Sequence, residues 1–267
     1  MRNHLILAAL VTSFILPAFS VQAATTSTIL VSGDLVRGES FSAVYYLGAD
    51  GFRYVFPNEK TYYTWYSDFS TVKQISDDQL GTIQIGGNVT YKPNSKMVKI
   101  NTDPKTYAVD TDGRLLWVTS ETVAEAMGGS DWNTKVDDIP DGFFSNYTSM
   151  GDTLESSSDV SSYKLRLASG LDANINDDKD LTDPTVVDIG ASSGSGFTPN
   201  SITVHAGRTV QFVNDSTEKH SATGDDGIWG TGTIEPSANF TIRFTTAGTY
   251  TYHCSYHTGM TGTIIVE

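Results

Sequence analysis

The stretch that decides how the last third of this 267-residue chain folds is Gly248-Thr-Tyr-Thr-Tyr-His-Cys254-Ser-Tyr-His257-Thr-Gly-Met260. Tyr250, Tyr252 and Cys254 alternate with polar residues, a period of two that is typical of a strand with one buried face. The same alternation occurs at 201–205, 210–212 and 240–245. Gly, Pro and Asn turns separate these runs, so the sequence predicts a small β-sandwich or barrel over residues 184–267.

The end of this stretch carries residues that bind metals. Cys254 ends a strand on its inward face, and the tight loop that follows contains His257, Gly259 and Met260. A second imidazole, that of His220, has to come from a distant loop. One thiolate, two imidazoles and one thioether are the ligands of a type 1 (blue) copper site, and they suit both Cu(I) and Cu(II). The sequence therefore predicts one copper ion per chain, held by four metal ligands and used for one-electron transfer: His220, Cys254, His257 and Met260.

Other interpretations of these residues stay open at this stage. Zinc is able to occupy the same ligands, although a Cys-His-His-Met set is unusual for a structural zinc site. In another interpretation, Met260 packs in the core and only His220, Cys254 and His257 bind the metal. We expect His253 to lie on the strand face opposite Cys254, at the surface or beside the ligands, and His205 to face solvent.

The same region resembles the plastocyanin/azurin (cupredoxin) family, and its short Cys-x-x-His-x-x-Met loop is most similar to that of amicyanin. The resemblance rests on four segments, which are 197–204, 206–212, 220–227 and 248–254. It implies a Greek-key β-sandwich and the ligand roles given above. The sequence departs from the family at Ser221, where members often have Asn, and at Tyr256 and Thr258, where they often have Pro. Such neighbours tune the reduction potential of a metal site.

Composition argues against several classes of function. The chain has 17 Lys and Arg against 31 Asp and Glu, a net charge of −14. Nucleic-acid binding and docking on anionic lipid both require basic surfaces, so neither is expected. We expect instead a redox partner protein with a basic docking patch, whose association weakens as salt rises. A single cysteine excludes an intrachain disulfide.

The sequence also argues against an enzyme. Beyond residue 23 it has four histidines, too few for additional copper centres, and one cysteine, too few for a binuclear centre. It contains no metalloprotease helix motif and no phosphate-binding loop. We therefore predict that the protein is not an enzyme.

Residues 1–23 have the pattern of a secretory signal peptide. Arg2 precedes an apolar run over 5–19, and small residues stand at the −3 and −1 positions of a cut after Ala23. An uncleaved anchor helix is the alternative, but the run is short for a membrane span, and no later run is long enough. The expected location of the protein is exported: periplasmic, at the cell surface or extracellular.

Residues 24–148 show a degenerate tandem repeat. Asp50-Gly51 and Asp112-Gly113 lie 62 residues apart between apolar runs, where Asp-Gly predicts a hairpin turn, and each is followed by a short helical stretch. The sequence predicts an N-terminal α+β region of hairpin-plus-short-helix repeats. This region resembles an uncharacterised module of exported candidate-phylum bacterial proteins, which hints at a cell-surface or adaptor role. Its many aromatic residues are expected to fill the core, with a surface stripe that binds glycan or protein as the alternative.

Residues 149–183 differ from both neighbours. They are rich in Ser and acidic residues, so we predict an extended linker without a packed core. Asp172 to Asp183 has acids and amides at calcium-loop spacing, but Asp177 replaces the expected Gly and Asp183 the expected Glu.

A second hypothesis for the whole chain remains. It is a cell-surface binding or structural protein whose C-terminal domain binds or buffers copper without electron-transfer turnover.

Overall fold

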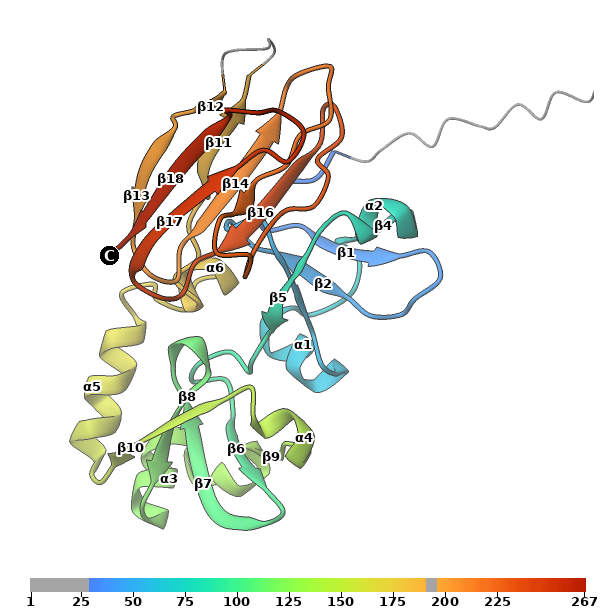
Figure 1. Cartoon of the computed structure of the whole chain (residues 1–267). Coiled ribbons are helices and arrows are strands. Elements are labelled where there is room, and N and C mark those ends of the chain that lie inside the picture. The colour runs from blue at the N-terminus through green and yellow to red at the C-terminus, as the bar shows by residue number, and fades with distance from the viewer. Residues whose placement is uncertain (1–28, 191–195) are drawn as a thin grey trace, which may run out of the picture.

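The computed structural model describes residues 29–190 and 196–267, which form two small α/β units and a β-sandwich (Figure 1). The predicted signal peptide, residues 1–23, lies outside the described residues. In the part of the chain that is described, no helix is long and apolar enough to cross a membrane.

The first unit contains a five-stranded sheet in the order β4-β1-β2-β3-β5. Strands β1 to β3 form an antiparallel meander, β4 lies parallel to β1, and β5 lies parallel to β3. Its elements are β1 (Leu35–Gly38), β2 (Tyr45–Leu47), β3 (Arg53–Val55), α1 (Glu59–Trp65), β4 (Val72–Ile75), α2 (Asp77–Gly81) and β5 (Ile85–Asn88).

The second unit repeats this topology. Its sheet has the order β10-β8-β7-β6-β9, with a central meander and one parallel strand at each edge. Its elements are β6 (Met97–Ile100), β7 (Asp103–Val109), η1 (Thr111–Gly113), β8 (Arg114–Val118), α3 (Glu121–Gly128), η2 (Trp132–Lys135), β9 (Val136–Asp138), α4 (Asp141–Phe144) and β10 (Thr148–Leu154).

The local signals of the repeat act at equivalent positions in both units. The turn glycines Gly51 and Gly113 both have positive φ, +83° and +67°, which an L side chain rarely adopts. Asn58 and Ser120, also 62 residues apart, cap helices α1 and α3 by accepting a backbone N–H. The repeat is larger than a hairpin plus one helix, because each unit adds two edge strands that pair with strands distant in sequence.

Most aromatic side chains of the first unit form its core. Tyr46, Tyr54, Phe56 and Tyr62 are buried. Phe41, Tyr63 and Phe69 remain 59%, 48% and 44% exposed, and three residues are too few for a long surface stripe.

The prediction of an extended linker over 149–183 is wrong. Strand β10 belongs to the second sheet, α5 (Ser157–Leu167) packs on the second unit, and α6 (Ile175–Asp178) packs on the first. A capping box between Ser156 and Asp159 starts α5. Val160, Tyr163 and Leu167, spaced for one helix face, are buried. The acidic composition masked this apolar face. The stretch with calcium-loop spacing forms α6, where the Asn174 side chain serves as the N-cap.

Residues 185–190 and 196–267 form the predicted mainly-β domain, a two-sheet Greek-key sandwich with sheet orders β12-β11-β14-β16 and β13-β18-β17-β15. Phe212, Tyr252 and Ile264 lie fully buried between the sheets. The strands are β11 (Thr185–Ile189), β12 (Phe197–Thr198), β13 (Ser201–Val204), β14 (Thr209–Asn214), β15 (Thr223–Gly224), β16 (Asn239–Arg243), β17 (Gly248–His253) and β18 (Thr261–Val266).

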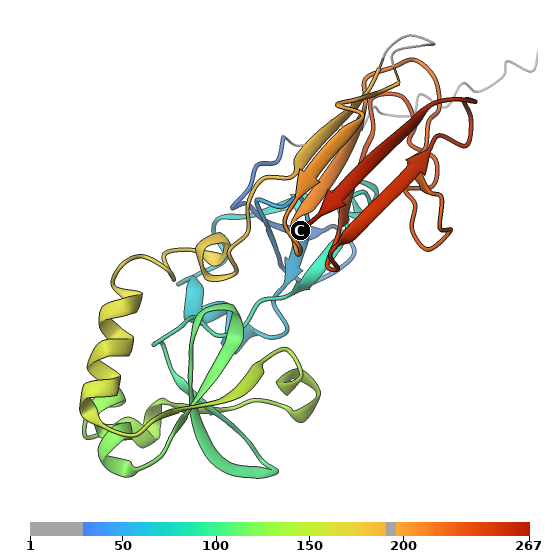
Figure 2. The ribbon, with the colours of Figure 1, turned by 60° about the vertical axis from the view of Figure 1, so that its left-hand side comes forward.

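One end of the sandwich rests on the first unit. Arg243, at the end of β16, forms an ion pair with buried Asp50 and contacts the Tyr54 hydroxyl at 2.6 Å. Arg208 pairs with Asp180 at 2.8 Å beside it. The second unit, the first unit and the sandwich therefore lie in a row (Figure 2).

Candidate metal centre

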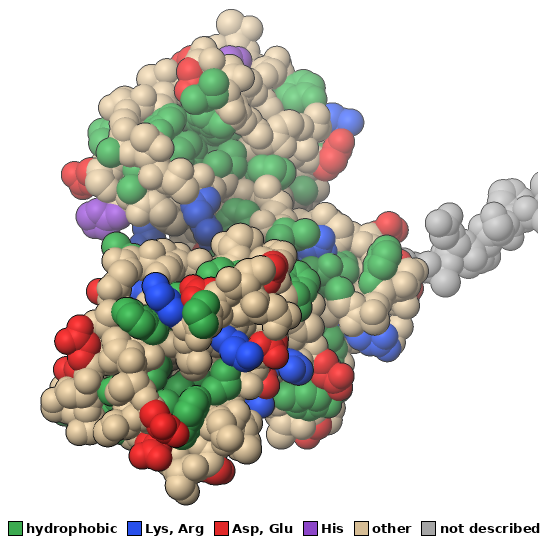
Figure 3. All heavy atoms as spheres, turned by 90° about the horizontal axis from the view of Figure 1, so that it is seen from below, with side chains coloured by type: hydrophobic (Ala, Val, Ile, Leu, Met, Phe, Trp, Pro, Cys, Tyr) green, Lys and Arg blue, Asp and Glu red, His purple; other side chains and the backbone are tan. Residues whose placement is uncertain are grey.

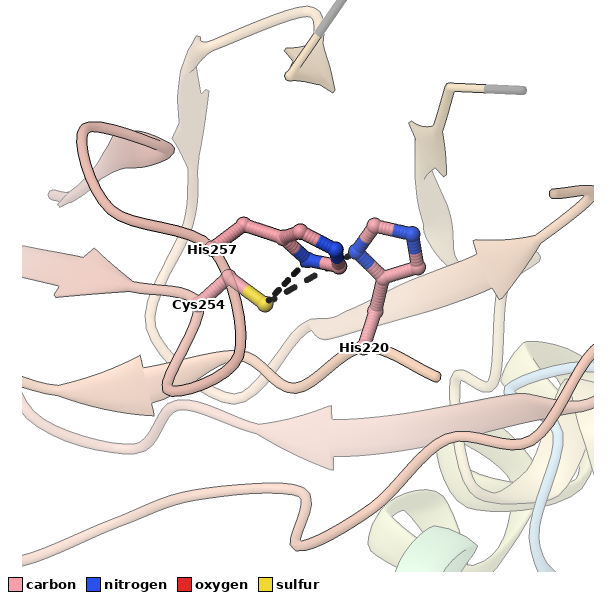
Figure 4. A group of neighbouring side chains, drawn as sticks. All are labelled: His220, Cys254 and His257. Atoms are coloured by element: carbon pink, nitrogen blue, oxygen red, sulfur yellow. Dashed lines mark hydrogen bonds between the residues drawn. The ribbon is translucent and has the colours of Figure 1, made fainter. Parts of the chain in front are cut away.

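Three side chains converge at the end of the sandwich opposite the first unit. His220, Cys254 and His257 each offer one ligand atom, and these atoms all lie within 4.8 Å of one another. The Cys254 sulfur lies 3.7 Å from Nδ1 of His220 and 3.4 Å from Nδ1 of His257. Figure 4 shows both rings turned toward the sulfur.

A closed loop after β17 positions two of the three side chains, those of Cys254 and His257. The Cys254 N–H donates to the Met260 carbonyl at 2.9 Å, and the Met260 N–H donates back to the His257 carbonyl at 3.3 Å. Gly259 has a φ of +83°, which lets the chain turn within this short loop. The backbone thus fixes the separation of Cys254 and His257.

The third side chain, His220, is held by backbone pairing and by a buried amide. His220 and Ile234 form a two-bond antiparallel bridge. The fully buried Asn214 side chain donates to the carbonyls of Glu218 and Ile234 at 2.8 and 2.9 Å. It also accepts from the Ser216 N–H and hydroxyl. This clamp shapes the loop that presents His220.

The sulfur has a hydrogen-bond donor as well. The Ser221 N–H points at the Cys254 sulfur at 3.4 Å, and the Ser221 hydroxyl accepts the Ser255 N–H at 2.9 Å. An N–H aimed at a thiolate stabilises its negative charge. Ser221 therefore ties together the two segments that carry His220 and Cys254.

The two imidazoles differ in environment. Burial, followed by the neighbouring His257, lowers the pKa of His220, which favours the neutral ring that a metal requires. His257 is 31% exposed, and its Nε2 lies 3.1 Å from a Glu218 carboxylate oxygen. A proton on that Nε2 leaves the Nδ1 lone pair free for a metal.

The donor distances agree with a shared metal ion. Metal–thiolate and metal–imidazole bonds are about 2.3 Å and about 2.0 Å long. Sulfur–nitrogen distances of 3.4 and 3.7 Å then correspond to angles of about 104° and about 119° at a common centre. These angles suit the trigonal His₂Cys arrangement.

The remaining predicted residues lie as follows. Met260 belongs to the ligand loop, and its side chain packs against the sandwich core. His253 contacts Asp225 at 2.6 Å with a half-exposed ring, and His205 is exposed, so both lie outside the cluster. Asn214, Glu218 and the Ser221 N–H were not predicted from the sequence, because backbone donors and loop contacts leave no residue pattern.

Comparison with known proteins places this region in a family. Residues 168–266 match the cupredoxin-like domain. Plastocyanin from Scenedesmus fuscus is 36% identical over 95 residues, which are 30% of this chain and 97% of that protein. A reduced Cu(I) form of an amicyanin mutant is 28% identical over 32% of this chain and 82% of that one, with a TM-score of 0.29. A Cu-containing nitrite reductase from Thermus scotoductus is 29% identical over 32% of this chain and 22% of that one, also at 0.29.

Proposed function

The chain belongs to the cupredoxin family through its C-terminal domain, and we propose that it is an exported type 1 copper protein that carries single electrons between redox partners. The observation that carries this proposal is the convergence of one thiolate and two Nδ1 atoms at distances that suit one metal ion. A copper ion in such a donor set cycles between Cu(I) and Cu(II), which is the chemistry of one-electron transfer.

In this proposal each residue has a defined task. Cys254, His220 and His257 would hold one copper ion, and the thioether of Met260 would complete the ligand set. The Ser221 N–H moderates the charge on the sulfur, and the closed 254–260 loop and the Asn214 clamp keep the donors fixed. Donors that do not move need little reorganisation when the charge of the site changes.

The exposed edge of His257 is the proposed point of electron entry and exit. His220 is buried, whereas His257 reaches the surface at the free end of the sandwich. The first unit contacts the opposite end, so a redox partner has access to His257. Given the net charge of −14, we propose a partner with a basic docking patch. Association that is insensitive to ionic strength would contradict this part.

Electron carriage is preferred over catalysis on the basis of ligand supply. The full sequence holds five histidines and one cysteine, and one proposed centre uses two of those histidines and the cysteine. The repeat module, residues 24–148 in the sequence prediction and extended to 154 by β10, is proposed to attach the protein to a surface or partner after export.

Spectroscopy of residues 24–267 with added Cu(II) tests the proposal. We expect an intense blue thiolate-to-copper absorption band and an EPR spectrum with narrow hyperfine splitting. Both should vanish in Cys254→Ser and persist in His205→Gln, which removes an exposed imidazole outside the cluster. A colourless wild-type protein would refute the type 1 site. Copper that binds but does not cycle with a reductant and an oxidant would favour copper buffering.

A further inference from the structure

The two repeat units carry equivalent clefts on their surfaces. The first has a volume of about 490 Å³ and the second about 480 Å³, the size range of ligand sites. Lining positions 42–44, 55–59 and 62 of the first correspond to 104–106, 117–121 and 124 of the second, an offset of 62 throughout. Both clefts lie where the end of a meander strand enters a helix.

The first cleft combines aromatic walls with a free carboxylate. Phe69 is 44% exposed and stacks at 4.3 Å on the buried Tyr62, and Phe143 of the second unit closes the cleft from across the junction. Glu59 lines the cleft and is exposed, and no hydrogen bond or ion pair involves its carboxylate among residues 29–190 and 196–267. An aromatic face beside an unpaired carboxylate attracts an organic cation.

The second cleft shows such a cation in place. The Lys105 ammonium lies 4.7 Å from the centre of the Trp117 ring, and both side chains line the cleft together with Glu121. Among the described residues, no carboxylate oxygen lies within 4 Å of this ammonium, although Lys105 is near enough to help lower the pKa of Asp103. The residue equivalent to Lys105 in the first cleft is Ala43, so the first cleft lacks an internal cation.

We propose that the first cleft binds a lysine or arginine side chain of a basic peptide segment, and that Lys105 blocks the equivalent site in the second cleft. Glu59 would accept hydrogen bonds from the ammonium or guanidinium group, and the aromatic walls would cover its methylene stem.

The charge around the first cleft supports a cationic ligand. Asp68 precedes Phe69, and Asp141 lies on the same short helix as Phe143. The nearby Lys60 already pairs with Asp137 at 3.8 Å. The face seen from below shows hydrophobic side chains at the surface between acidic and basic ones (Figure 3). With a net charge of −14, the molecule attracts basic segments over long range.

This inference rests on the attachment role proposed for the repeat module and names the chemistry of its partner. It does not depend on copper. The blue absorption band, measured in the same samples, therefore separates failure of this inference from failure of the copper site.

The test is the binding of a fluorescently labelled short oligolysine peptide to residues 24–267, followed by anisotropy. Glu59→Gln and Glu121→Gln change the net charge equally, so general attraction to an acidic protein weakens equally in both. We expect Glu59→Gln to weaken binding about tenfold, the loss of one charge-assisted hydrogen bond. We expect Glu121→Gln to leave binding within about twofold of wild type.

Lys105→Ala supplies the second half of the test. Removal of the internal cation should raise the number of peptides bound per protein chain from one to two. Adding Glu121→Gln to Lys105→Ala should return this number to one. Equal weakening by the two glutamate variants, or an unchanged stoichiometry in Lys105→Ala, would overturn the proposal. Binding of a neutral glycan that displaces the peptide and is indifferent to Glu59→Gln would also overturn it, in favour of a carbohydrate site.

Discussion

Replacement of Arg243 by Met should loosen the contact between the sandwich and the first unit. The Asp50 side chain that pairs with Arg243 is only 5% exposed. Removal of one partner from a buried ion pair generally costs about 3–5 kcal/mol, because the other charge stays buried without compensation. Asp50 keeps hydrogen bonds from the Phe52 N–H at 3.3 Å and the Tyr54 hydroxyl at 2.6 Å. We therefore expect Arg243→Met to lower the free energy of unfolding by about 3 kcal/mol, near the lower limit of that range.

The same interface offers a matched control. Arg208 pairs with Asp180 at 2.8 Å, but the Asp180 side chain is 83% exposed. Exposed pairs contribute about 0–1 kcal/mol, so Arg208→Met should change the free energy of unfolding by no more than that. Both variants remove one positive charge from the same end of the sandwich. The comparison of the two variants therefore separates the effect of a buried ion-pair partner from the effect of a change in net charge.

Urea unfolding followed by tryptophan fluorescence measures both losses. A double-mutant cycle with Asp50→Asn should give a coupling energy above about 1 kcal/mol for Arg243, because contacting residues are not additive. Equal losses in the Arg243 and Arg208 variants would refute the reasoning from burial. The copper absorption band should stay unchanged in both, because the interface lies at the opposite end from Cys254.

Three further changes probe other parts of the molecule. Burial raises the pKa of Asp178 to about 7, above the value of about 3.9 for an unfolded chain. Between about pH 4 and pH 7, the folded state therefore binds a proton that the unfolded state does not. The free energy of unfolding should therefore fall by up to about 4 kcal/mol as pH rises from 4 to 7, and Asp178→Asn should flatten that slope in urea titrations at several pH values. Gly262→Ala should cost about 1–3 kcal/mol in thermal unfolding, because the new Cβ meets the Tyr252 ring, whereas Gly142→Ala, with no atom within 4 Å, should be nearly neutral. Asn214→Ala should weaken copper binding about 10–100-fold in a chelator competition, because the loop that carries His220 loses its buried clamp; unchanged affinity would contradict that role.

The parts of the fold that the sequence predicted are those with local signals. Alternation marks the strands of the sandwich, and the two Asp-Gly turns mark the repeat because a hairpin is decided by residues within its own turn. The edge strands β4, β5, β9 and β10 escaped prediction. All four pair in parallel with strands far away in the sequence, and β4, β5 and β9 have only three or four residues, so no nearby residue pattern encodes them.

For residues 149–183, composition and periodicity predict different structures, and periodicity predicts the observed one. Residues 149–183 are polar on average, yet Val160, Tyr163 and Leu167 occupy one face of α5 and bury it on the second unit. Three apolar residues at helical spacing stabilise a short helix that already has a capping box. For the candidate metal centre, the sequence singled out the three side chains that the structure brings together, but not the Ser221 N–H, since every residue except proline has one.

The order of the three bodies separates the two proposed activities in space. The sandwich meets the first unit through Arg243 and Arg208, and its ligand loops lie at the far end. The first cleft lies at the junction of the two repeat units, where Phe143 of one unit covers residues of the other. A basic segment in that cleft and a redox partner at His257 therefore do not compete for the same surface. Attachment through Glu59 should leave the rate of electron exchange at His257 unchanged, and a rate that falls when oligolysine binds would show that the two sites are coupled.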